Sequence, residues 1–299
     1  MIEELEKLVS AGNVFAGKNL KEYTTFKVGG PAKAIVSVND TEELKQVMQY
    51  LWDNHIPYFV IGNGSNLLVS DKGYDGVVIK LSGDFLELSS KGEEITAGAG
   101  VILSKVCTLA RDKALSGLEF AYGIPGTVGG AMVMNAGAYD GEMSFVVKSV
   151  EMLDASGKVI TYSCKDMNFG YRDSVCKQEK LIVLKTVFSL KSKEKNEIQE
   201  KMNDFMEKRR SKQPLEFPSA GSTFKRPEGY FAGKLIMDAG LAGKRVGGAS
   251  VSTKHCGFVI NDKNGSAEDI DTLMKEVTDT VYEKFGVKLE PEVIRIGEF

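Results

Sequence analysis

Two clusters of glycine residues, each placed directly after a short apolar segment, constrain the fold of this chain more than any other feature. Glycine accounts for 32 of the 299 residues, about 11 %, against a usual share of ~7 %. The first cluster is Gly62-Asn63-Gly64-Ser65-Asn66, and the second, at residues 123–131, has the sequence GIPGTVGGA. Such clusters allow the backbone to approach other backbone, or a ligand, closely.

The segment after the first cluster argues against a Rossmann dinucleotide-binding unit. The Rossmann fingerprint G-x-G-x-x-G opens a helix. Here the sixth position is Leu67, and residues 67–70 form a short apolar run that predicts a strand. Two interpretations stay open, a tight turn between strands and a nest of backbone N–H groups that binds a pyrophosphate.

Hydrophobic periodicity along the chain predicts an α+β protein. The helix that starts at Thr41 should carry an apolar face of Leu44, Val47, Met48 and Leu51, at 3- and 4-residue spacing. We expect Thr41 to cap this helix, and residues 266–269 to open the last helix as a capping box. The first eighty residues contain a βαβ unit. The expected helices are residues 2–10, 41–54, 101–114, 193–212, 231–239 and from 266 onward. The expected strands are 34–38, 58–61, 67–70, 77–81, 85–89, 94–97, 146–154, 181–190, 247–252, 257–260 and 287–296.

Composition excludes several classes of protein. The net charge of −3, from 38 basic and 41 acidic residues, argues against a nucleic-acid-binding coat. Four cysteines without a CxxC pair and only two histidines give little basis for a metal site or a histidine-based triad. No apolar run approaches the ~20 residues of a membrane helix, and the acidic N-terminus does not resemble a signal peptide. We expect a cytoplasmic protein that binds neither nucleic acid nor membrane and holds no metal.

Five motifs in a fixed order carry a family resemblance. They are the first cluster, the second cluster, Tyr171-Arg172-Asp173-Ser174, Ala220-Gly221-Ser222-Thr223-Phe224-Lys225 and Glu290-Pro291-Glu292-Val293. Alone, the last three would be a surface arginine, a turn serine and an edge-strand carboxylate. In this order, from about residue 19 to the C-terminus, the chain resembles the UDP-N-acetylenolpyruvoylglucosamine reductase (MurB) family of bacterial cell-wall synthesis.

The resemblance implies an α+β flavoprotein with three parts. Residues 1–80 and 81–208 would form two subdomains of the FAD-binding fold that is called PCMH or vanillyl-alcohol-oxidase-like. Residues 209–299 would form a C-terminal α+β substrate-binding domain, and the last strand is free to pack back on the first subdomain. We expect a monomer that acts on a small nucleotide-sugar substrate.

The resemblance also implies the cofactors. FAD would be held noncovalently between the two N-terminal subdomains, and NADPH would be the hydride donor. The two glycine clusters would contact the FAD pyrophosphate and the flavin, and the stretch at 23–25 would border the cofactor. The expected cofactor-binding residues are Gly62, Asn63, Gly64, Ser65, Asn66, Gly123, Ile124, Gly126, Thr127 and Gly129.

Three residues match the catalytic positions of the family. Reduced flavin would pass a hydride from N5 to the β-carbon of UDP-N-acetylglucosamine enolpyruvate, and Ser222 would protonate the α-carbon to give UDP-N-acetylmuramate. Arg172 and Glu292 would polarise the substrate carboxylate. This chemistry suits these residue types, since a cation in a water-poor site stabilises negative charge as it develops. A serine can act as the acid only when it is well positioned against a strong base.

The chain departs from the family pattern at a few positions. Arg226 follows Lys225, where many relatives have asparagine, and Arg295 lies one residue later than the arginine that many relatives carry. The segment after Arg172 reaches Leu181 within nine residues, so the chain resembles the group without the inserted tyrosine loop.

Two other interpretations stay open. An alcohol or sugar oxidase on the same FAD fold would often attach FAD through a histidine near the first cluster, but the nearest one, His55, precedes the strand that leads there. A flavin-free protein that binds phosphorylated sugars or nucleic acid would use the basic run at 208–212. That run also suits a solvated helix end, where cations complement the helix dipole.

Overall fold

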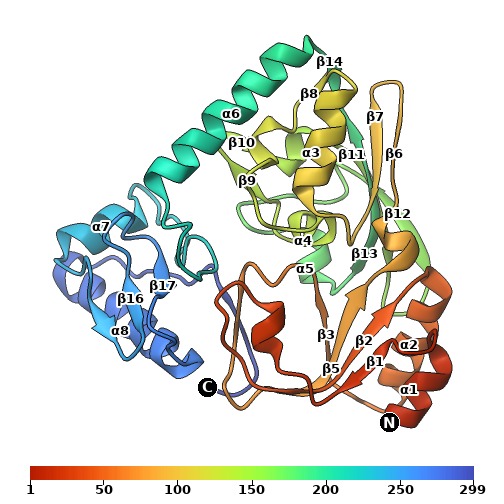
Figure 1. The fold of residues 1–299 in the computed structure, drawn as a ribbon, viewed down its shortest axis with the longest axis horizontal. Coiled ribbons are helices and arrows are strands. Elements are labelled where there is room, and N and C mark those ends of the chain that lie inside the picture. Colours follow the sequence, from red (N-terminus) through yellow and green to blue (C-terminus); the bar gives the residue numbers. More distant parts are fainter. The chain divides into compact units, whose positions relative to one another are not determined.

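The computed structural model describes residues 1–299, which form two compact units (Figure 1). The first unit comprises Met1–Ala16, Ala34–Asn63 and Gly76–Arg209, and the second comprises Gly17–Lys33, Gly64–Asp75 and Arg210–Phe299. The chain therefore passes from one unit to the other inside the first glycine cluster. None of its helices is both long and apolar enough to cross a lipid bilayer.

The N-terminal part of the first unit is a four-stranded sheet with two helices. Strand β1 is antiparallel to β2, and β3 is parallel to β5. The predicted apolar face of α2 is confirmed, since Leu44, Val47, Met48 and Leu51 are all buried. In the order β1-β2-β5-β3, the strands are β1 (Val14–Ala16), β2 (Ala32–Val38), β5 (Tyr74–Leu81) and β3 (Tyr58–Ile61), and the helices are α1 (Ile2–Leu8) and α2 (Thr41–Asp53).

The rest of the first unit is an antiparallel five-stranded sheet, on which α3 and α4 pack. Its strands, in order, are β12 (Val159–Ser163), β11 (Val147–Leu153), β13 (Ile182–Ser189), β7 (Glu94–Gly98) and β6 (Leu88–Lys91). The helices are α3 (Leu103–Asp112), α4 (Val128–Val133), α5 (Val175–Gln178) and α6 (Lys195–Lys212), which ends in the second unit. The short elements are β8 (Leu115–Ser116), β9 (Gly137–Ala138), β10 (Gly141–Glu142) and β14 (Lys191–Ser192), with 3-10 turns η2 (Gly83–Leu86), η3 (Glu119–Ala121) and η4 (Met143–Phe145).

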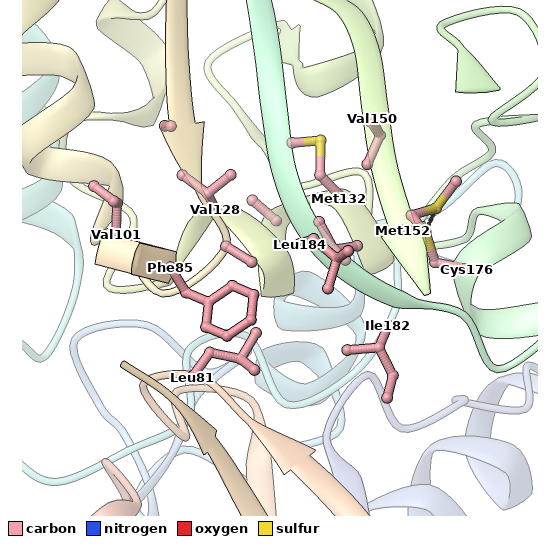
Figure 2. Packing of buried hydrophobic residues seen from close by; sticks show 14 of the residues in the cluster. Leu81, Phe85, Val101, Val128, Met132, Val150, Met152, Cys176, Ile182 and Leu184 are labelled. Atoms are coloured by element: carbon pink, nitrogen blue, oxygen red, sulfur yellow. Dashed lines mark hydrogen bonds between the residues drawn. The ribbon is translucent and has the colours of Figure 1, made fainter. Parts of the chain in front are cut away.

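One hydrophobic core joins the two sheets of the first unit. Figure 2 shows Val128 and Met132 of α4 beside Leu184 of β13, with Leu81 and Phe85 next to them. Leu81 ends β5 of the first sheet, and Leu184 lies in the second sheet. The helix that begins in the second glycine cluster is therefore fixed to the core through its apolar face.

The second unit is built around a long helix and a small antiparallel sheet. Helix α8 packs on all three strands of this sheet, β15, β16 and β17, and against α7. The strand β4 pairs in parallel with β18, so the segment after the first glycine cluster pairs with the end of the chain. The elements are η1 (Leu20–Tyr23), β4 (Leu67–Val69), α7 (Ala232–Asp238), β15 (Arg245–Val246), β16 (Ala249–Val251), β17 (Val259–Asn261), α8 (Ala267–Phe285) and β18 (Ile294–Ile296).

Three expectations from the sequence are wrong in detail. The cap of α2 is Asp40, not Thr41, because the Asp40 carboxylate accepts hydrogen bonds from the Glu42 and Glu43 N–H groups, both at 2.8 Å. Residues 85–89 are not one strand, because Phe85 is buried in the 3-10 turn η2, whose Asp84 N–H donates to the Asn39 carbonyl (2.7 Å). The final strand is interrupted, since Pro291 forms an isolated antiparallel bridge with Phe224 and β18 begins only at Ile294, where the chain pairs with β4 instead.

The predicted capping box of α8 is confirmed, and a residue far away in sequence strengthens it. Ser266 and Asp269 exchange the two reciprocal hydrogen bonds. The Asp71 carboxylate, which follows β4, also accepts from the Ala267 and Glu268 N–H groups at 3.0 and 3.1 Å. A carboxylate at a helix N-terminus satisfies free N–H groups and suits the positive end of the helix dipole.

Asp71→Ala should therefore lower the free energy of unfolding by about 1 kcal/mol, the usual cost of a lost helix cap. Denaturant unfolding followed by circular dichroism measures this loss. Asp75→Ala is the matched control, because Asp75 makes only an exposed ion pair with Lys33, and such pairs contribute little. Equal effects of the two substitutions would contradict the capping role of Asp71.

Candidate active site

The two glycine clusters meet within the first unit. The Asn63 side chain donates from Nδ2 to the Pro125 carbonyl at 2.7 Å. A Cβ on Gly62 would collide with the Thr127 hydroxyl, so only glycine allows this approach. Thr127 caps α4, its hydroxyl accepting from the Gly130 N–H. The structure thus brings together residues that the sequence assigned to one cofactor from positions about sixty residues apart.

Unpaired backbone N–H groups remain in both clusters. The N–H groups of Asn63, Gly64 and Ser65 donate to no acceptor within the chain, and neither do those of Gly126 and Thr127. By contrast, the Val128 and Gly129 N–H groups are bonded to the carbonyls of Val101 and Ala99, both at 2.8 Å. Unpaired N–H groups in turns are the donors that an anionic group such as a pyrophosphate requires. The residues present therefore fit an FAD.

Within the second unit, Gly64 of the first cluster packs on the stretch at 23–25. Gly64 has a φ of +59°, and a Cβ there would overlap the Tyr23 carbonyl oxygen. The Thr25 N–H donates to the Gly64 carbonyl at 3.2 Å. Glycine is required here both for its left-handed conformation and for the close packing.

Ser222 and Glu292 lie on adjacent segments of the second unit. The Glu292 N–H donates to the Thr223 carbonyl at 2.8 Å, and the Lys225 N–H donates to the Glu290 carbonyl at 2.8 Å. Thr223 is fully buried, and its hydroxyl accepts from the Val259 N–H at 2.8 Å. The neighbouring Ser222 is exposed and makes no hydrogen bond within the chain, so its hydroxyl is available to a ligand.

Arg172 belongs to the first unit, and a tight turn holds it. Gly170 and Asp173 exchange backbone hydrogen bonds at 3.0 and 3.4 Å, and Arg172 at the tip has a φ of +56°. Its guanidinium donates to the Gly137 carbonyl at 3.3 Å and lies 5.0 Å from the centre of the Tyr171 ring. A left-handed conformation is uncommon for arginine. Asn135, which is buried, supports the turn by donating to the Gly170 carbonyl at 3.0 Å.

The two arginines that depart from the family pattern both have defined contacts. Arg295 on β18 forms an ion pair with Asp271 of α8, a carboxylate that is 3 % exposed and also pairs with Lys275 at 2.6 Å. Arg226 lies 4.0 Å over the centre of the Phe231 ring, and its Nε donates to the Tyr230 carbonyl. Arg295 therefore fastens β18 to α8.

Sequence reasoning did not single out Arg209. This residue lies in the basic run at 208–212, yet its side chain packs against Gly123 of the second cluster. Burial lowers its pKa, and the nearby Tyr139, whose own pKa burial raises, stacks on Phe205 with ring centres 4.6 Å apart. The density of the basic run was the only signal in the sequence, and it does not distinguish Arg209 from its neighbours.

Comparisons with known proteins show the family of this chain. A family model described as UDP-N-acetylenolpyruvoylglucosamine reductase, C-terminal domain, matches residues 213–296, and a model described as FAD binding domain matches residues 32–163. The reductase of that name from Caldanaerobacter subterraneus subsp. tengcongensis is 46 % identical over 298 residues, covering 100 % of this chain and 98 % of the relative. The one from Clostridium beijerinckii is 48 % identical over 292 residues, covering 98 % and 96 %.

A solved structure gives the same result. The crystal structure of UDP-N-acetylenolpyruvylglucosamine reductase from Thermus caldophilus matches with a TM-score of 0.82 and 38 % identity, covering 95 % of this chain and 98 % of that one. The predicted α+β fold, with an FAD-binding part followed by a distinct C-terminal domain, is confirmed. The chain belongs to the UDP-N-acetylenolpyruvoylglucosamine reductase family and is an FAD-dependent oxidoreductase.

Proposed function

We propose that this enzyme uses NADPH to reduce the enolpyruvyl group of UDP-N-acetylglucosamine enolpyruvate, and that the product is UDP-N-acetylmuramate for peptidoglycan synthesis. The observation that carries the proposal is the 2.8 Å hydrogen bond from the Glu292 N–H to the Thr223 carbonyl. It holds the two family-matched residues of the C-terminal domain on neighbouring segments. Relatives that are 46 to 50 % identical carry the name of this reaction. The enzyme works in the cytoplasm, where nucleotide sugars and NADPH are made.

Both glycine clusters hold the FAD. The unpaired N–H groups at 63–65 and 126–127 supply donors to its pyrophosphate and flavin edge. The FAD site also includes Gly123, Ile124 and Gly129 of the second cluster. Arg209, beside Gly123, adds a positive charge to this site. When bound there, FAD would supply the hydride chemistry of the reduction, with NADPH as the donor. No histidine lies in either cluster, which supports noncovalent attachment.

Arg172 and Glu292 make the substrate carboxylate an electron sink. A hydride adds poorly to an electron-rich enol ether unless the adjoining carboxylate can accept the electron pair that is displaced. The Arg172 guanidinium stabilises that charge as it forms. Glu292, when protonated, donates a hydrogen bond to the same group. The turn that fixes Arg172 keeps the cation in place before the reaction begins, so little reorganisation is needed.

Ser222 completes the addition. After the hydride has formed a C–H bond at the β-carbon, the Ser222 hydroxyl donates its proton to the α-carbon. Water then protonates the serine oxygen again. The hydroxyl can do this because no group in the chain competes for it. The developing carbanion is a strong enough base to take a proton from a well-placed serine.

Ser222→Ala should separate the two half-reactions. NADPH should still bleach the flavin absorption at the normal rate, while reoxidation by the enolpyruvyl substrate should slow about 10²- to 10⁴-fold, the usual contribution of a positioned acid. Stopped-flow absorbance under anaerobic conditions measures both rates. Ser219→Ala, three residues earlier, is the matched control. Reoxidation at the normal rate in Ser222→Ala would show that another group donates the proton.

Acid precipitation should release the cofactor. The purified protein is expected to be yellow, and after precipitation the flavin spectrum should move to the supernatant, because FAD is held only by noncovalent contacts. Absorption spectra of supernatant and pellet measure this. A flavin that stays in the pellet would mean covalent attachment and would favour an oxidase. A colourless protein that takes up no added FAD would contradict the whole proposal.

A further inference from the structure

The first glycine cluster contains two asparagines whose side chains are directed to different units. Asn63 Nδ2 donates to the Pro125 carbonyl at 2.7 Å, inside the first unit. Asn66 Nδ2 donates to the Glu292 carbonyl at 3.0 Å, inside the second unit. The family resemblance implies the same role for both residues, namely contact with the cofactor. The structure instead directs each amide to a protein carbonyl.

Asn66 holds the Glu292 segment with its main chain as well as its side chain. The Ile294 N–H donates to the Asn66 carbonyl at 2.9 Å. Directly afterwards the parallel ladder of β4 and β18 begins, with Leu67 opposite Ile294. Asn66 therefore forms hydrogen bonds to the residues on both sides of Val293, which is buried. These bonds fix the register at the start of β18.

The opposite side of Glu292 is held by the serine segment. Its N–H is bonded to the Thr223 carbonyl, and Thr223 is anchored by the Gly257 carbonyl and the Val259 N–H, each at 2.8 Å. Both polar backbone groups of Glu292 are thus occupied, the N–H by Thr223 and the carbonyl by Asn66. If either bond is lost, the Glu292 side chain can shift relative to Ser222.

We propose that Asn66 is a positioning residue that sets Glu292 against Ser222, and that Asn63 closes the cofactor cradle between the two glycine clusters. This division rests on the proposed function, because it assigns Asn66 to the step in which Glu292 and Ser222 act. The side-chain amide and the main-chain carbonyl of Asn66 are both bonded to the 292–294 segment. Asn66 acts through the Glu292 backbone.

The test compares Asn66→Ala, Asn66→Asp and Asn63→Ala with the wild-type holoenzyme. Both Asn66 variants should keep their FAD on gel filtration and be reduced by NADPH at the normal rate. Their reoxidation by the enolpyruvyl substrate should slow about 10- to 100-fold, the scale that a small misplacement costs. Asn66→Asp has the shape of asparagine but cannot donate to the Glu292 carbonyl, so it should not rescue the rate. Asn63→Ala should instead release FAD more readily.

Two further measurements separate positioning from general damage. The pH profile of the reoxidation rate should change shape in the Asn66 variants. A smaller amount of folded enzyme would instead lower the rate by the same factor at every pH. Hydrogen exchange of the Ile294 amide should become faster in the Asn66 variants and stay unchanged in Asn63→Ala.

The outcomes distinguish this proposal from the proposed function. If the wild-type enzyme reoxidises with the enolpyruvyl substrate but the Asn66 variants match it, the positioning role is wrong. Normal exchange at Ile294 in those variants overturns it too, even if the wild type proves inactive with this substrate. An inactive wild type would overturn the proposed function by itself.

Discussion

The hydrogen bond between the Glu292 N–H and the Thr223 carbonyl, 2.8 Å long, is the interaction on which the rest of the site depends. It joins the C-terminal segment to the one that carries Ser222. Thr223 can serve as the anchor because it is buried and its own hydroxyl and N–H are bonded to the 257–259 segment. Leaving a buried backbone group without a hydrogen bond costs free energy. These hydrogen bonds therefore keep the Glu292 segment beside Thr223.

The interleaved chain explains why the first glycine cluster and the Glu292 segment are connected. The second unit takes a short piece from before β5, including β4, and pairs it with β18 at the end of the chain. Asp71, just after β4, then caps α8, and Arg295 on β18 pairs with Asp271 of the same helix. The β4–β18 pairing and the Asp71 cap link residues about 200 positions apart. Asn66, at the end of the first glycine cluster, therefore contacts the Glu292 segment directly.

The sequence predicts those parts of the fold that depend on local pattern. The apolar face of α2 and the capping box of α8 follow from residue spacing, and both are confirmed. The five motifs predict the family, which the comparisons confirm. The roles of Arg172, Ser222 and Glu292 stay predictions that rest on the family pattern and on the geometry described above.

What the sequence could not predict depends on contacts between distant segments. The sequence around Phe85 predicts a strand, but Phe85 lies in the 3-10 turn η2, which the Asp84 N–H holds to the Asn39 carbonyl. The sequence predicts Arg209 to be one of several solvated cations, but in the structure its side chain packs on Gly123. Asn63 and Asn66 are equivalent in the motif, and only their different acceptors separate them.

One isotope experiment tests the central claim, that hydride reaches the β-carbon and a protein proton reaches the α-carbon. The enzyme would be supplied with NADPH that carries deuterium at the transferred position, in ordinary water, together with the enolpyruvyl substrate. Proton NMR of the product should show one deuterium on the β-carbon and only hydrogen on the α-carbon. The N5–H of reduced flavin exchanges with water, so the amount of deuterium retained can vary, but deuterium on the α-carbon would contradict the account.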